Sequence, residues 1–109
     1  MSHFTMIGAN ELCQLMNRDN YRLIDIREND EYADGHINTS INVPLSQMQC
    51  LDLNLEAEQK LVFYCRSGKR TEANQALLAQ CYNQEAYILS GGLTAWGEAG
   101  YKINRTQAA

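Results

Sequence analysis

The residues best suited to chemistry stand together in CRSGKR, residues 65–70, between an apolar run and a helical pattern. A helix start presents free N–H groups and a partial positive charge. A short loop around such a start can direct further N–H groups at one point and form an anion nest. Gly68 permits the bend and is expected at positive φ. Cys65 is expected to ionise at a lower pH than an ordinary cysteine, which predicts a nucleophile there.

Three cations, Arg66, Lys69 and Arg70, support this interpretation, because they crowd into five residues of a chain whose net charge is −4. An ionised thiolate needs no general base, and neither histidine, His3 or His36, lies near this loop in the sequence. A cysteine-protease arrangement, which needs an imidazole in contact with the sulfur, is therefore disfavoured. The competing interpretation is a buried, inert cysteine before an ordinary basic turn. That interpretation fits the other three cysteines, which are Cys13, Cys50 and Cys81.

The composition limits the other classes of function. The net negative charge makes nonspecific binding to nucleic acid or anionic membrane unexpected, and no apolar run approaches the roughly 18 residues that span a membrane. Residues 1–16 carry no signal-peptide pattern, and no Cys or His spacing fits a zinc site. We therefore expect a cytoplasmic protein with reduced cysteines and no metal or organic cofactor.

Hydrophobic periodicity predicts that strands and helices alternate along the chain. Strands are expected at residues 4–7, 22–26, 40–43, 61–64 and 86–89, and helices at 10–17, 28–33, 71–82 and 93–99. A short helix followed by loop is expected between 45 and 55. Gly8 or Asn10 is expected to cap the first helix, and Gly35 and Gly100 to follow the ends of the second and the last.

This order predicts an α/β fold with a mostly parallel sheet of about five strands, flanked by helices on both faces. One domain is expected over residues 1–109, with a frayed tail at 104–109. The run at 61–64 (LVFY) is apolar on both faces, as expected at the centre of a parallel sheet. Because sites form beyond the carboxyl ends of such strands, Cys65 is well placed for chemistry.

The helix expected at 71–82 carries an apolar side formed by Ala73, Ala76, Leu77, Leu78 and Cys81. Thr71 is expected as its N-cap, with an incomplete capping box because Asn74 stands where Glu or Gln is typical.

Three ordered segments of the sequence resemble the rhodanese family of sulfurtransferases. Residues 23–44 (LIDIRENDEYADGHINTSINVP) are similar to the family's D-x-R-x-x-x-E-Y/F-x-x-G-H-I stretch followed by N-V/I-P. Residues 64–71 (YCRSGKRT) are similar to its loop C-x-x-G-x-R, and residues 89–96 (LSGGLTAW) to its GG-x-x-x-W. Residues 38–40 (Asn-Thr-Ser) depart from the x-Gly-Ala of many members, which is expected to affect only a turn.

The resemblance implies that Cys65 attacks the outer sulfur of a donor such as thiosulfate, releases sulfite and keeps a persulfide. A nucleophilic acceptor, cyanide or a thiol, then takes that sulfur. The terminal sulfur is anionic, and it is expected to bind the N–H groups of Arg66, Ser67, Gly68, Lys69, Arg70 and Thr71. Arg66 and Lys69 are expected to bind the dianionic donor, whereas Arg70 is the candidate to fold inward and brace the loop.

Asp25, Arg27 and Glu31 also match the family pattern and are expected to form a structural ion-pair network rather than to act in catalysis. In this network Arg27 is expected to lie within reach of Glu31 and near the pocket. The remaining motif residues are assigned structural roles: His36 as a hydrogen-bonded turn residue, Trp96 in the core, and Gly91 and Gly92 as sites of close packing beside the active loop.

Two other functions compete with sulfur transfer. Phosphatases and arsenate reductases with a Cys-Arg loop place five residues between cysteine and arginine, whereas four separate Cys65 from Arg70. The shorter loop suits a single sulfur atom better than a tetrahedral oxyanion. A noncatalytic binding or regulatory module of the same family is the second alternative. A protein persulfide carrier is a further candidate partner, and a monomer and a homodimer are both compatible with the sequence.

Overall fold

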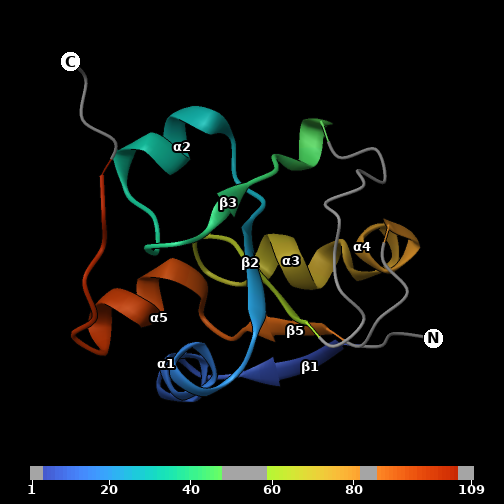
Figure 1. Ribbon diagram of the computed structural model, residues 1–109. Helices are drawn as coiled ribbons and strands as arrows, with labels where there is room; N and C mark the ends of the chain where they lie inside the picture. The colour runs from blue at the N-terminus through green and yellow to red at the C-terminus, as the bar shows by residue number, and fades with distance from the viewer. Residues whose placement is uncertain (1–3, 48–58, 82–85, 106–109) are drawn as a thin grey trace.

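The chain folds around a five-stranded sheet in which every strand pairing is parallel (Figure 1). The computed structural model describes residues 4–47, 59–81 and 86–105. Within these residues the sheet order is β1-β5-β4-β2-β3. The strands are β1 (Phe4–Ile7), β2 (Tyr21–Asp25), β3 (Ile41–Asn42), β4 (Lys60–Tyr64) and β5 (Ala86–Leu89). The predicted α/β class with about five strands is therefore confirmed.

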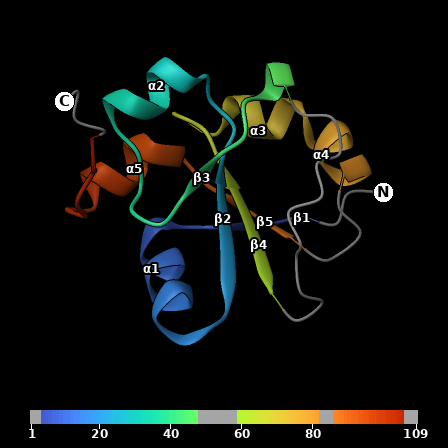
Figure 2. The ribbon, with the colours of Figure 1, turned by 45° about the horizontal axis from the view of Figure 1, so that its top comes forward.

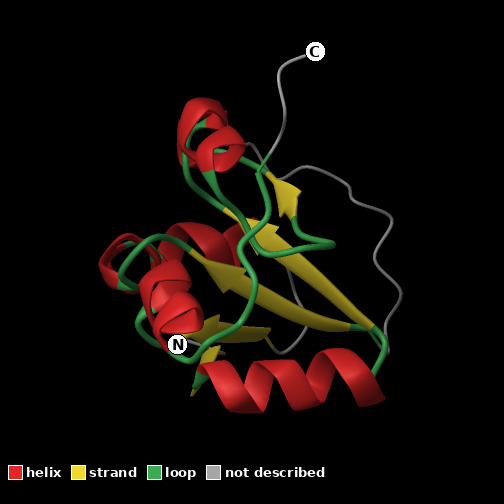
Figure 3. Cartoon of the chain, turned by 90° about the vertical axis from the view of Figure 1, so that its left-hand side faces the viewer, coloured by secondary structure: helices red, strands yellow, loops and turns green. Residues whose placement is uncertain are grey.

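Helices cover both faces of the sheet, as predicted (Figure 2). On one face, α1 and α5 pack against Leu23, Val62 and Leu89, and Figure 3 shows the long helix α1 lying along the sheet. On the other face, Leu78 of α4 packs against Ile24 and Phe63. The helices are α1 (Ala9–Arg18), α2 (Asn29–Asp34), α3 (Lys69–Ala73), α4 (Gln75–Cys81) and α5 (Gly92–Glu98), with one 3-10 turn, η1 (Leu45–Gln47). None of the helices in these described ranges is long and apolar enough to cross a membrane.

β4 lies between β5 and β2 and is buried on both faces, which explains its unbroken apolar sequence. Successive side chains along a strand point to opposite faces. Leu61, Phe63 and Cys65 accordingly join one core cluster, while Val62 and Tyr64 join the other. The register pairs Tyr64 with Asp25. β2 and β4 therefore end next to each other, at the edge of the sheet where the predicted site residues lie.

The helix predicted at 71–82 is broken at Asn74 and begins earlier, at Lys69. The Asn74 side chain donates to the Arg70 carbonyl at 2.7 Å, and its N–H bonds Thr71 O, three residues back. Such local side-chain bonds compete with the regular helical pattern. The break changes which residues face the core, so the predicted apolar side is wrong at Ala73 and Ala76, which are exposed, and right at Leu78. Leu77 is half-buried, and the side chain of Cys81 lies outside the described residues.

Thr71 is not the N-cap that the sequence predicted. Gly68 occupies that position, with φ 92° in the left-handed region. Thr71 is fully buried in the first turn, and its hydroxyl donates to the Gly68 carbonyl at 2.8 Å. For α1, the cap is Gly8 rather than Asn10.

The tail is fixed at Asn104, where the sequence predicted fraying. Asn104 and His36 form an antiparallel bridge with two N–H···O bonds of 2.8 Å. Figure 1 shows the segment after α5 rising along the molecule to reach the end of α2. The fraying predicted for 106–109 and the loop predicted within 48–58 lie outside the described residues.

Candidate active site

Cys65 follows β4 directly and lies beneath the turn that begins α3. The Gly68 N–H donates to Cys65 Sγ at 3.1 Å. Gly68 has the positive φ that the sequence predicted, 92°, a conformation that costs glycine little and other residues more. The first N–H groups of α3 have no partners inside the helix because they precede its first hydrogen bond. The loop therefore directs one N–H donor, that of Gly68, at the sulfur, next to the start of a helix.

The Cys65 side chain is only 1% exposed. It belongs to the apolar cluster that includes Ile26, Phe63 and Leu78, and the Thr71 hydroxyl lies 3.8 Å from Sγ. Within the described part of the chain, Gly68 is the one residue whose backbone N–H bonds Sγ. Sγ is thus almost fully enclosed beneath the loop.

Gly91 and Gly92 bring α5 against the Cys65 loop, as the sequence predicted. Leu93 N–H donates to Cys65 O at 2.8 Å, and Thr94 N–H donates to Arg66 O at 2.9 Å. A Cβ added at Gly92, where φ is 57°, would run into both of these carbonyl oxygens. The loop is therefore clamped between two helix starts, its own at α3 and that of α5.

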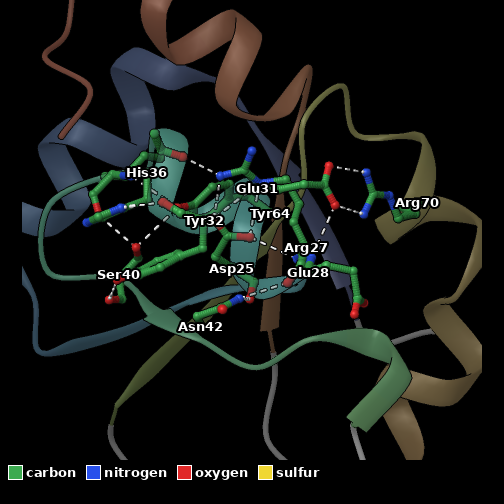
Figure 4. A network of polar contacts seen from close by, with 12 residues as sticks. Asp25, Arg27, Glu28, Glu31, Tyr32, His36, Ser40, Asn42, Tyr64 and Arg70 are labelled. Atoms are coloured by element: carbon green, nitrogen blue, oxygen red, sulfur yellow. Dashed lines mark hydrogen bonds and ion pairs between the residues drawn. The ribbon is translucent and has the colours of Figure 1, made fainter. Parts of the chain in front are cut away.

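The arginine nearest the loop end is braced by a carboxylate. Arg70 makes two hydrogen bonds of 3.0 Å with the two oxygens of Glu31. The hydrogen bond from Arg70 is the largest reason why the pKa of Glu31 falls from 4.5 to about 2. Figure 4 shows the Arg70 guanidinium facing Glu31 across the space between α3 and α2. This contact ties the loop to the neighbouring helix.

Arg27 pairs with Asp25, its neighbour in the expected network, whereas Glu31 forms its ion pair with Arg70. Its backbone N–H, Nε and Nη2 all donate to the Asp25 carboxylate, at 2.8–3.2 Å, and Nη2 also donates to Gly35 O. Asp25 stands two residues before Arg27 and is fully buried. A charge buried in this way needs a close partner, and Asp25 is held there by its own strand.

A cleft of about 300 Å³ opens beside the loop. Its walls come from α2, the Cys65 loop, the start of α5 and the segment after α5. The lining residues are Arg27, Glu31, Asp34, Gly35, Arg66, Leu93, Thr94 and Ile103. Of the two cations expected to bind the donor, Arg66 lines this cleft, whereas Lys69 is exposed and is not part of the lining. In the residues that the structure describes, no group of three or more His, Cys, Asp or Glu is arranged to hold a metal ion.

The sequence model of the rhodanese-like domain family matches residues 8–99. This chain belongs to the rhodanese-like domain family. It is 26% identical over 99 residues to the thiosulfate sulfurtransferase GlpE of Shewanella oneidensis, an alignment that covers 91% of this chain and 98% of the relative. It is 31% identical over 98 residues to a sulfurtransferase of Allochromatium vinosum, covering 89% and 92% of the two chains.

A solved structure supports the same relationship. The crystal structure of a rhodanese-related protein from Thermoplasma volcanium has a TM-score of 0.77 and 29% identity, covering 94% of this chain and 98% of that one. Two of these relatives are named sulfurtransferases, which supports the sulfurtransferase family for a chain with the rhodanese-like fold.

A buried polar network that the sequence did not predict lies next to the ends of β2 and β4. Tyr64 OH accepts from Ile37 N–H at 3.0 Å and donates to Ser40 Oγ at 3.1 Å. Burial, with a further contribution from Asp25, raises the pKa of the Tyr64 hydroxyl above its ordinary value, so it stays protonated. Asn42 Nδ2 bonds the carbonyls of Asp25 and Arg27 (Figure 4).

The departure at residues 38–40 from the family pattern has a structural explanation. Thr39 has φ 72°, a left-handed conformation that favours glycine, and its hydroxyl lies 2.6 Å from Tyr21 OH. Ser40, in place of the common Ala, supplies the oxygen that accepts from Tyr64 OH. The Thr39 and Ser40 side chains therefore both contribute hydrogen bonds around this turn.

The remaining motif residues occupy structural positions, as predicted. His36 stacks on Tyr32 with ring centroids 3.9 Å apart, and its Nδ1 lies 2.8 Å from Tyr32 O. Trp96 is buried, donates from Nε1 to Lys102 O at 3.1 Å and stacks on Tyr101. Four of the cleft residues, Asp34, Gly35, Leu93 and Thr94, stood inside two of the recognised motifs, whereas Ile103 stood outside them.

Proposed function

We propose that this chain is a thiosulfate sulfurtransferase that carries a sulfane sulfur as a persulfide on Cys65. The observation that supports it most directly is the Gly68 N–H bonded to Cys65 Sγ at 3.1 Å, at the carboxyl end of the central strand. This geometry stands in a chain whose relatives are named sulfurtransferases. A preorganised N–H donor stabilises negative charge on sulfur without reorganisation during the reaction.

The reaction has two half-steps. The Cys65 thiolate attacks the outer sulfur of thiosulfate, the S–S bond of the donor breaks, and sulfite leaves with its electron pair. A nucleophilic acceptor, cyanide or a thiolate, then attacks the outer sulfur of the persulfide. The second S–S bond breaks, and its electron pair returns to Cys65 Sγ. Covalent catalysis of this kind divides one transfer into two and gives ping-pong kinetics.

The loop residues divide into holding and bracing roles in this proposal. Arg66 and Lys69 are both exposed and attract the dianionic donor. The N–H groups of the turn that begins α3 hold the terminal sulfur of the persulfide. Arg70 keeps the loop in place through Glu31. Asp25 and Arg27 support the loop from the adjacent strand end.

Burial of the nucleophile favours sulfur transfer over phosphate ester hydrolysis. Sγ lies under a loop with four residues between Cys65 and Arg70, and the side chain is 1% exposed. A terminal sulfur atom is slim enough to reach it, whereas a tetrahedral phosphate needs a wider cradle. Because a persulfide requires a free thiol, we place the protein in a reducing compartment, the cytoplasm.

The test is intact-protein mass spectrometry after incubation with thiosulfate, followed by peptide mapping and then by cyanide. We expect a gain of about one sulfur mass on the Cys65 peptide, lost again on cyanide treatment, because the route is covalent. Cys65→Ser removes the gain and the transfer activity, while Cys13→Ser, a half-buried cysteine on α1, retains both. Persulfide on another cysteine, or aryl phosphate turnover that depends on Cys65, contradicts the proposal.

A further inference from the structure

The cleft beside the Cys65 loop is larger than either simple assay substrate requires. Its volume is about 300 Å³, which lies at the lower end of the roughly 300–1,000 Å³ typical of pockets for organic small molecules. Cyanide and thiosulfate fill only a fraction of such a space. The cleft adjoins the loop, because Arg66 lines it and Leu93 and Thr94, also in the lining, bond the carbonyls of Cys65 and Arg66.

One wall of the cleft carries a buried cation with an unused donor. Arg27 is 4% exposed, and its Nε and Nη2 are taken by Asp25 and Gly35 O. Nη1 has no acceptor among the described residues. Nη1 also retains some exposure. In the described residues, the fully buried side-chain nitrogen and oxygen atoms without a hydrogen-bond partner are those of Arg22 and Asn104, and Nη1 is not among them. Arg27 lines the cleft, and Nη1 is its guanidinium nitrogen without an acceptor in the described residues, so Nη1 is the donor available to a ligand there. In Figure 4 the free nitrogen of this guanidinium points away from Asp25.

The rim of the same cleft carries one unpaired charge of each sign. Arg66 and Asp34 are both exposed and both line the cleft. Neither takes part in an ion pair within the described ranges, where the pairs are Arg18–Asp19, Arg27–Asp25 and Arg70–Glu31. Leu93 and Ile103 add apolar surface between them. The lining therefore matches a small organic molecule with a carboxylate, an ammonium group and a short aliphatic part.

We propose that this cleft is the acceptor subsite, and that it selects low-molecular-weight thiols that carry a carboxylate and an ammonium group. The proposal rests on the proposed function. The carboxylate binds Arg27 Nη1 and Arg66, and the ammonium group faces Asp34. Charge-assisted hydrogen bonds of this kind are the strongest available to such a ligand. The thiol end is left to reach over Arg66 toward the sulfur on Cys65.

The chemical step is balanced without any further reagent. The thiolate of the acceptor attacks the outer sulfur of the Cys65 persulfide and forms a new S–S bond. The bond between that sulfur and Sγ breaks, and its electron pair remains on Sγ as a thiolate. The product is the persulfide of the small thiol, which keeps the same carboxylate and ammonium group and so occupies the same subsite before it leaves.

The test isolates the acceptor half-reaction. Protein is loaded with thiosulfate and freed of donor, and loss of the persulfide is followed in single turnover with cysteine, 3-mercaptopropionate, cysteamine and 2-mercaptoethanol. These probes carry both charges, the carboxylate alone, the ammonium alone and neither. Arg66→Gln should slow discharge by 3-mercaptopropionate about tenfold, the value of one charge-assisted contact. Discharge by 2-mercaptoethanol should change by less than about twofold, because it makes no such contact.

Two further variants and a control sharpen this test. Arg27→Lys keeps a positive charge beside Asp25 but has no second nitrogen to offer to the cleft. This variant should therefore also slow discharge of the persulfide by 3-mercaptopropionate more than discharge by 2-mercaptoethanol. Asp34→Asn should reduce the advantage of cysteine over 3-mercaptopropionate. Lys102→Gln removes an exposed cation that does not line the cleft and should leave all four rates unchanged.

Binding without chemistry separates this inference from the proposed function. S-methylcysteine, whose sulfur is blocked, should perturb the amide NMR signals of Thr94 and Arg66 in the wild type and much less in Arg66→Gln. If no persulfide forms but S-methylcysteine binds, the proposed function fails and the subsite stands. If the persulfide forms and Arg66→Gln slows every thiol equally, or S-methylcysteine does not bind, the subsite is refuted while sulfur transfer survives.

Discussion

Two arginine–carboxylate pairs flank the Cys65 loop, and they differ mainly in burial. Arg27–Asp25 is enclosed, with side chains 5% and 0% exposed, whereas Arg70–Glu31 is open to solvent, at 40% and 31%. Losing one partner of a buried pair is strongly destabilising, because the remaining charge is left largely shielded from water and without its counter-charge. An open pair is screened and contributes little to stability. The inner pair therefore holds the fold together behind the loop, and the outer pair adjusts where the loop lies.

The largest expected effect comes from opening the inner pair. Asp25→Ala leaves the Arg27 guanidinium buried without its partner, which should lower the free energy of unfolding by about 3–5 kcal/mol. Urea denaturation of this variant and of Glu31→Ala makes the comparison direct. Equal losses in the two variants would contradict the distinction between an inner and an outer pair.

The next effect concerns the hydroxyl network that supports the inner side. Ser40→Ala deprives the buried Tyr64 hydroxyl of its acceptor, and an unsatisfied buried polar group costs about 1–3 kcal/mol. Tyr64→Phe in the Ser40→Ala background removes the orphaned group, so the double variant should lose less stability than the two single losses added together. Strict additivity in thermal and denaturant unfolding would show that this bond contributes nothing.

A smaller effect, with a pH signature, is expected at the outer pair. Glu31→Gln should lower stability at neutral pH by no more than about 1 kcal/mol. Because the pKa of Glu31 falls from 4.5 to about 2 in the folded state, the stabilisation is complete above pH 4.5 and disappears as the pH falls toward 2. The difference between wild type and Glu31→Gln should therefore shrink across this interval. A difference that stays constant from pH 7 to pH 2 would falsify the assignment.

The smallest effect is a response to salt. At 1 M salt the screening length is about 3 Å, so the residual contribution of Glu31 to stability should decrease further. The penalty of Asp25→Ala should change much less, since a mostly buried pair is screened much less than an exposed one. Unfolding curves at low and high salt for both variants provide the measurement, and an equal salt response in both would count against the comparison.

Local patterns predicted the part of the fold that carries the nucleophile. The apolar run ending at Tyr64 could only be a central strand, and Gly68 in a short basic loop required a left-handed turn, so both were predicted correctly. Asn74 was not readable as a helix break, because the same residue is tolerated inside helices when its side chain bonds elsewhere. The sequence grouped Asp25, Arg27 and Glu31 in one network, but it could not show that the strand end presents the Asp25 carboxylate to Arg27 while Glu31 pairs with Arg70.

The cleft was missed because its walls meet only in three dimensions. Ile103 reaches it from the segment after α5, which is fastened by the bridge between His36 and Asn104. Hydrophobic periodicity does not predict a contact between residues as far apart in the sequence as His36 and Asn104. A local motif can locate a reactive atom, but the space around that atom depends on how distant segments are joined.

The position of Ile103 separates the size of the cleft from the geometry of the turn that holds Cys65 Sγ. Its side chain fits over two glycines, since a Cβ at Gly35 or at Gly97 would come within 2.9 Å of it. Ile103 belongs to no helix or strand. Within the described residues, its backbone makes no hydrogen bond to the turn that holds Sγ. A lineage can therefore resize the neighbouring cavity by exchanging one side chain at this position. Such an exchange leaves the turn around Cys65 in place, so the shape of the cavity and the geometry at the sulfur can change independently.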